Sequence, residues 1–70
     1  MITKAEKDSL LAQAEELVTR AGGPGFAQAR FNGLVAEFRA ATGVSKERAR
    51  HWVAKAIRRA RNPKKGGNRG

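Results

Sequence analysis

The chain has 70 residues and no cysteine, and its fifteen Lys and Arg residues against six acids give a formal charge of +9. This length suffices for one small domain, and a chain with one histidine and no cysteine offers neither a disulfide framework nor a protein-only metal site. The N-terminal stretch is charged at positions 4, 6, 7 and 8, with no apolar run long enough for a signal peptide or a membrane span. We therefore expect a cytoplasmic, single-domain protein without a cofactor and without a membrane partner.

The positive charge is concentrated at the C-terminal end of the sequence. Residues 44–70 carry ten bases and one acid, whereas residues 1–43 carry five of each. A field this asymmetric attracts polyanions to one face of a protein, as it does in proteins that bind the phosphate backbone of nucleic acids. The alternative interpretation is a basic segment that serves only solubility.

The hydrophobic pattern predicts an all-α fold, a small bundle with helices at residues 3–21, 24–42 and 45–61. The first helix opens with a capping box of Thr3 and Glu6, and the glycines after residue 21 can end it. Its apolar side can serve the core or a dimer interface, and we favour the core. The second begins near Pro24, a residue favoured in the first turn of helices. Asn32-Gly33 can kink or split this second segment, which would make the bundle four-helical.

The third predicted helix is strongly amphipathic. Its apolar stripe consists of Ala49, Trp52, Val53, Ala56, Ile57 and Ala60. Because Trp52 lies on this stripe, we assign it to the core rather than to base stacking. The opposite face is basic around Ala54, whose small side chain permits close approach to a groove.

Only residues 43 and 44 separate the second and third predicted helices, and Ser45 opens the third. Gly43 can adopt a positive φ, Val44 can fill the gap between the helices, and Ser45 can cap the third helix. A helix, a tight turn and a second helix with a basic outer face are typical of helix-turn-helix DNA-binding domains. We expect residues 1–62 to form such a domain and residues 63–70, which are basic and rich in glycine, to form a disordered tail.

The segment GVSKERARHWVAKAIRRARNP, residues 43–63, resembles the recognition helix of region four of the primary bacterial sigma factors. The shared features are, in order, a small-residue turn, a hydroxyl cap, a basic residue, Glu-Arg, another basic residue, Ala-Lys-Ala and a run of bases before proline. The resemblance implies a helix that enters the major groove of promoter DNA. It also implies that Lys46, Glu47, Arg50 and His51 stand where the base-reading and phosphate-binding residues would be.

A recognition helix presents the side chains of its first two turns to base edges, and its later side chains run out along the backbone. The predicted base-reading residues are accordingly Lys46, Glu47, Arg50 and His51. The predicted phosphate-binding residues are Arg48, Lys55, Arg58, Arg59, Arg61, Lys64 and Lys65.

These patterns together predict sequence-specific binding of double-stranded DNA. The protein would be a small, nucleoid-associated transcription regulator, or an accessory factor of a phage or mobile element, and a homodimer on two half-sites is left open. We do not expect an enzyme, since the chain has one histidine and no paired carboxylates on a pocket-forming scaffold. The alternatives are an interaction module that docks on RNA polymerase or another complex, and a small RNA-binding protein, for which aromatic stacking positions are missing.

Overall fold

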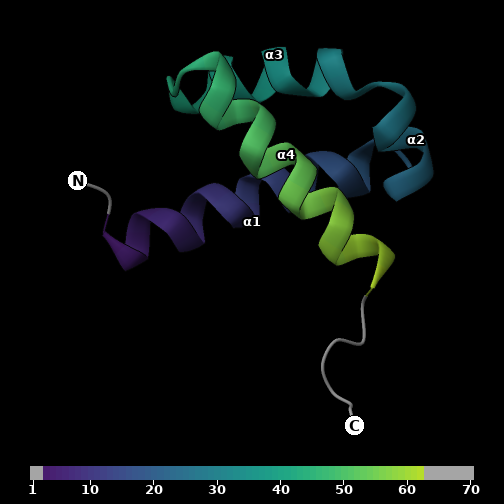
Figure 1. Ribbon diagram of the computed structural model, residues 1–70, viewed down its shortest axis with the longest axis horizontal. Coiled ribbons are helices and arrows are strands. Elements are labelled where there is room, and N and C mark those ends of the chain that lie inside the picture. The colour runs from purple at the N-terminus through teal and green to yellow at the C-terminus, as the bar shows by residue number, and fades with distance from the viewer. Residues whose placement is uncertain (1–2, 63–70) are drawn as a thin grey trace, which may run out of the picture.

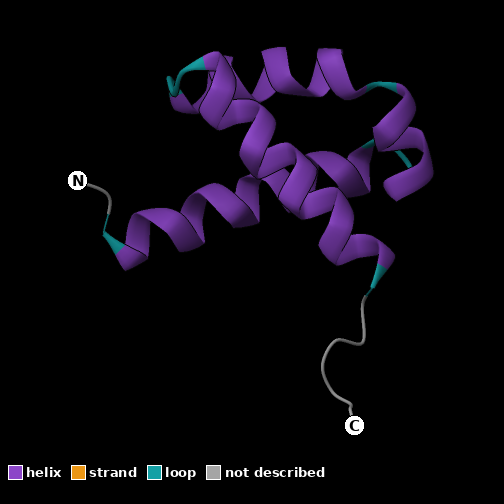
Figure 2. Ribbon diagram, viewed as in Figure 1, coloured by secondary structure: helices purple, strands orange, loops and turns teal. Residues whose placement is uncertain are grey.

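The computed structural model describes residues 3–62, and this part of the chain is built of helices and short loops without a strand (Figure 1, Figure 2). The helices are α1 (Lys4–Arg20), α2 (Pro24–Ala29), α3 (Phe31–Thr42) and α4 (Lys46–Arg61). α4 packs against all three other helices, most extensively against α1, which it crosses in the view of Figure 1. The predicted all-α fold is confirmed, and the predicted tail of residues 63–70 lies outside the described range.

Both ends of α1 are fixed by local hydrogen bonds. At its start, the Glu6 backbone N–H donates to Thr3 Oγ1 over 3.1 Å, and the Thr3 N–H donates to Glu6 Oε1 over 3.2 Å. At its end, Gly22 has a φ of 107°, and the N–H groups of Gly22 and Gly23 donate to the carbonyls of Thr19 and Val18. This arrangement is a Schellman motif, which requires a left-handed residue just past the helix. The predicted capping box and the glycine stop are both confirmed.

Of the two alternatives for residues 24–42, the split segment and the four-helix bundle are confirmed, but the break lies at Arg30 and not at Asn32-Gly33. Arg30 has φ −110° and ψ 24°, and it ends α2 and begins α3. The break falls two residues before Asn32-Gly33, which lies in the first turn of α3. α2 is thereby turned to bury Ala27 against α1 and α4, while α3 buries its own apolar side against α4. Packing, rather than a helix-breaking residue, sets the position of the break.

One hydrophobic core joins the four helices. Its buried members are Ala14, Val18, Ala27, Leu34, Val35, Phe38, Ala49, Trp52, Val53, Ala56 and Ile57. The four alanines among them have no exposed surface, so the backbones of the helices can approach one another closely. Trp52 belongs to this core, as predicted. Ala60 does not, because it faces an open groove between α1 and α4.

Each of the three residues in the turn between α3 and α4 stabilises the turn in a different way. Gly43, with a φ of 78°, ends α3 by donating its N–H to the Arg39 carbonyl over 2.7 Å. Val44 is half-buried and packs against the core, and Ser45 Oγ accepts the Arg48 N–H over 3.3 Å at the start of α4. A left-handed glycine, an apolar contact and a hydroxyl cap thus fix the direction in which α4 leaves the turn.

Candidate nucleic-acid interface

α4 has a buried apolar side and an exposed basic side. Its buried side chains are Ala49, Trp52, Val53, Ala56 and Ile57. Every lysine and arginine of α4 is exposed, and the helix has seven of these bases against the single acid Glu47. Because the apolar side is held by the other helices, the basic side is turned to solvent along the whole length of α4, about 24 Å at 1.5 Å per residue.

The four predicted base-reading residues lie in the first two turns of α4 and are all exposed. Lys46, Glu47, Arg50 and His51 fall within one sector of the helix at 100° per residue. The His51 ring packs edge-on against Trp52, with ring centroids 5.1 Å apart and an angle of 79° between the planes. Since Trp52 is fixed in the core, this contact restricts the rotamers of His51.

Ala54 is exposed one turn after Arg50, between the residues of the first turns and the arginines of the last. Its methyl side chain makes a shallow depression among the long lysine and arginine side chains of the exposed side. The predicted phosphate-binding residues Arg48, Lys55 and Arg61 are also exposed on α4. Lys64 and Lys65 lie outside the described residues.

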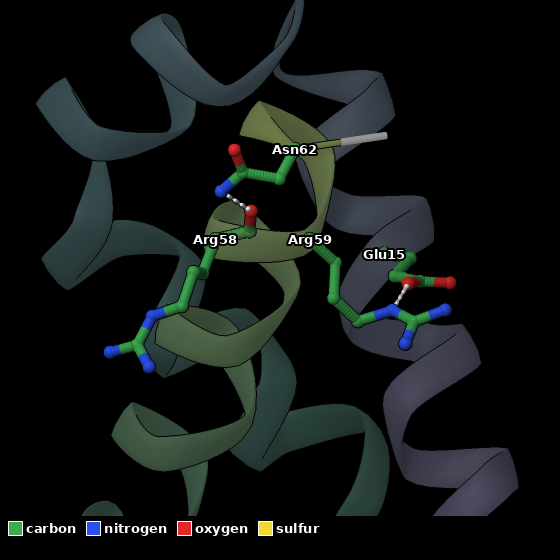
Figure 3. Close-up of polar contacts among 4 residues, drawn as sticks. All are labelled: Glu15, Arg58, Arg59 and Asn62. Carbon is green, nitrogen blue, oxygen red and sulfur yellow. Dashed lines mark hydrogen bonds and ion pairs between the residues drawn. The ribbon is translucent and has the colours of Figure 1, made fainter. Parts of the chain in front are cut away.

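The adjacent residues Arg58 and Arg59 point to opposite sides of α4 (Figure 3). Arg59 Nε donates to Glu15 Oε2 of α1 over 2.7 Å, which is the one ion pair within residues 3–62. The Arg58 side chain extends away from α1, and its backbone carbonyl accepts a long hydrogen bond of 3.5 Å from Asn62 Nδ2 (Figure 3). The two arginines therefore enter different electrostatic surroundings although they are neighbours in sequence.

Two residues outside α4 belong to the same surface and were not predicted from the sequence. Glu15 neutralises Arg59 across 44 positions of sequence, and Gln28 of α2 lines a depression beside Arg58 and Arg61. Gln28 is exposed and Glu15 is half-buried, and a periodic pattern does not distinguish either from other polar residues. Only the packing of α1 and α2 against α4 brings them to the basic surface.

Neither a group of metal-ligating side chains nor a membrane-spanning helix occurs among residues 3–62. No three His, Asp or Glu side chains in this range are grouped so that they could hold a metal ion. None of the helices described combines the length and the apolar character needed to cross a membrane. Comparison of the chain with family models, with curated protein sequences and with solved structures gave no match.

Proposed function

We propose that the chain binds double-stranded DNA as a helix-turn-helix protein, with α4 as the recognition helix in the major groove. The observation that carries the proposal is the exposed side of α4, with seven bases and one acid, on a helix whose other side is locked in the core. A B-DNA major groove is about 12 Å wide and accepts one α-helix. The three-residue turn after α3 suits the same interpretation, since it holds the start of α4 in a fixed direction.

The proposal gives the two halves of α4 different tasks. Lys46, Glu47, Arg50 and His51 would contact base edges, with Glu47 able to accept a hydrogen bond from a cytosine amino group. Lys55 and the arginines of the last turns would contact phosphates and supply affinity for any sequence. A small domain of this kind gains specificity when two copies bind half-sites about 34 Å apart, so a homodimer on DNA belongs to the proposal.

In the cell, such a protein would act on the nucleoid as a small transcription regulator, or as an accessory factor of a phage or mobile element. Glu47 in the first turn stabilises the helix dipole, and its exposed neighbours Lys46, Arg50 and His51 in the same sector support a sequence-reading role.

Replacing Ala54 by glutamate tests the proposal, because it places bulk and negative charge in the middle of the exposed side of α4. The variant should lose binding to labelled duplex DNA in fluorescence anisotropy and keep the helical circular dichroism and melting temperature of the parent, since Ala54 is exposed. Ala12→Glu is the matched control: Ala12 is exposed on α1 about 160° from the buried Ala14, so the same change there should leave DNA binding intact.

The result that overturns the proposal is an Ala54→Glu variant that binds DNA as well as the parent does. An RNA hairpin and purified RNA polymerase, measured at the same salt concentration, identify the alternatives. Tighter binding to the hairpin would favour the RNA-binding alternative, and binding to polymerase that Ala54→Glu abolishes would favour docking through α4.

A further inference from the structure

A notch lies between α2 and the C-terminal half of α4. Its lining residues are Gln28, Ala54, Ile57, Arg58, Arg61 and Asn62. Ile57 is 3% exposed and forms the floor with the small side chain of Ala54, so the polar lining residues stand around a low centre. Gln28 is the one lining residue that comes from another helix.

The notch is positively charged and rich in hydrogen-bond donors. Arg58 and Arg61 are three residues apart on α4 and so lie on the same side of it, and neither has an acidic partner within residues 3–62. No acid lines the notch. The C-terminal end of α4 contributes a partial charge of about −0.5, which the two guanidinium groups outweigh. The amide of Gln28 adds a neutral donor that costs no charge repulsion.

A tetrahedral phosphate matches this set of groups. The planar guanidinium fork binds two phosphate oxygens at once, and the amide N–H₂ of glutamine can donate to a third. The opposite flank of α4 differs, because there Glu15 already neutralises Arg59. Anion binding is thus favoured more on the α2 flank of α4 than on the α1 flank.

We propose that the notch between α2 and α4 binds one phosphate of the DNA backbone, and that Gln28 is a phosphate-binding residue. The proposal rests on the proposed function for the identity of the phosphate. A phosphate held by α2 and α4 together contacts two elements whose relative position is fixed. Contacts from long arginine side chains alone would leave the whole domain free to rotate in the groove. The notch therefore sets the depth and rotation of α4 in the groove, which is the positioning task of backbone contacts.

Gln28→Glu tests the notch on duplex DNA of random sequence. The substitution keeps the shape of the side chain and brings a negative charge beside the bound phosphate, so affinity should fall about tenfold at low salt. Gln28→Ala, which removes the amide without adding a charge, should cost about threefold. Gln13→Glu on α1 is the matched control, since it makes the same change in the depression between α1 and α3 and should alter affinity less than about twofold.

Inorganic phosphate separates failure of the notch from failure of the DNA proposal. In nitrogen-15 NMR of the full chain, phosphate should shift the side-chain resonances of Gln28, Arg58 and Arg61 in a saturable manner, and those of Arg59 little. If the parent binds DNA but Gln28→Glu behaves as Gln13→Glu does, the notch is overturned and the proposed function stands. If the parent binds no DNA and phosphate still saturates the notch, the site stands as an anion site and only its assignment to DNA falls. If neither is observed, both proposals fall.

Discussion

Glu15 pairs with Arg59 and so keeps this arginine from contacting a phosphate. Removing the charge of Glu15 should therefore strengthen DNA binding. Glu15→Gln keeps the size of the side chain and abolishes the ion pair with Arg59, whose Nε lies 2.7 Å from Glu15 Oε2. Arg59 is then free to neutralise a phosphate. The side chains of Arg59 and Glu15 are 57% and 40% exposed, so the pair contributes only about 0–1 kcal/mol to folding and its loss should leave the domain folded.

The size of the gain follows from counterion release. Each phosphate that a base neutralises adds about 0.9 to the magnitude of the slope of log K against log salt, which is up to about eightfold in affinity at 0.1 M salt. Fluorescence anisotropy on a random duplex at four or five salt concentrations measures both quantities. Glu15→Gln should therefore bind several times more tightly than the parent and show a steeper slope.

Glu16→Gln is the control, because it changes the net charge by the same amount at the next position of α1, where residues 3–62 offer no ion pair. Its affinity should stay within about twofold of the parent's, since an exposed charge away from the contact surface is screened. Equal gains for both variants would refute the reasoning, because the effect would then come from net charge alone. Weaker binding by Glu15→Gln would also refute it, and would show that Glu15 holds Arg59 in the position that contacts DNA.

Three further outcomes are expected. Binding of the parent to random duplex should fall with salt at a slope of about −5 to −6, and a slope shallower than about −2 would contradict contact with the phosphate backbone. Glu47→Ala should relax preference at one or two base pairs by about 1–3 kcal/mol without weakening non-specific binding, which a comparison of selected and random duplexes measures; unchanged preference would remove Glu47 from the reading surface. Gly43→Ala should lower the free energy of unfolding in urea by about 1–2 kcal/mol, because φ is 78° there, although no atom crowds the added Cβ; an unchanged midpoint would show that the turn relaxes.

The ends of the helices could be predicted from the sequence because local groups determine them. The capping box of Thr3 and Glu6, the left-handed Gly43 and the hydroxyl of Ser45 all satisfy backbone groups within four residues of themselves. The break at Arg30 has no such signal. It arises because Ala27 is buried against α1 and α4, while Leu34, Val35 and Phe38 must be buried from α3. Both contacts depend on helices distant in sequence.

Only those features of the candidate site that depend on α4 alone could be predicted from the sequence. The periodicity of α4 gave the exposure of Ala54, Arg58 and the base-reading candidates correctly, because a buried stripe fixes the opposite face, but it wrongly placed the exposed Ala60 on the buried stripe. It could not show that Arg59 is tied to Glu15 or that Gln28 adjoins Arg61, since these neighbours come from α1 and α2. Contacts between elements need the crossing geometry of the helices, which one sequence does not contain.

The separation of the two sides of α4 has a consequence for how this surface can change over generations. The buried side chains of α4 hold the fold and the exposed ones do not, so mutations at positions 46, 47, 50, 51 and 54 can accumulate with little penalty in folding. A lineage could exchange one partner for another while its scaffold stays the same. In the laboratory, a library randomised at these five positions would consist mostly of folded members, so selection from it for DNA binding would test the proposed recognition without interference from folding.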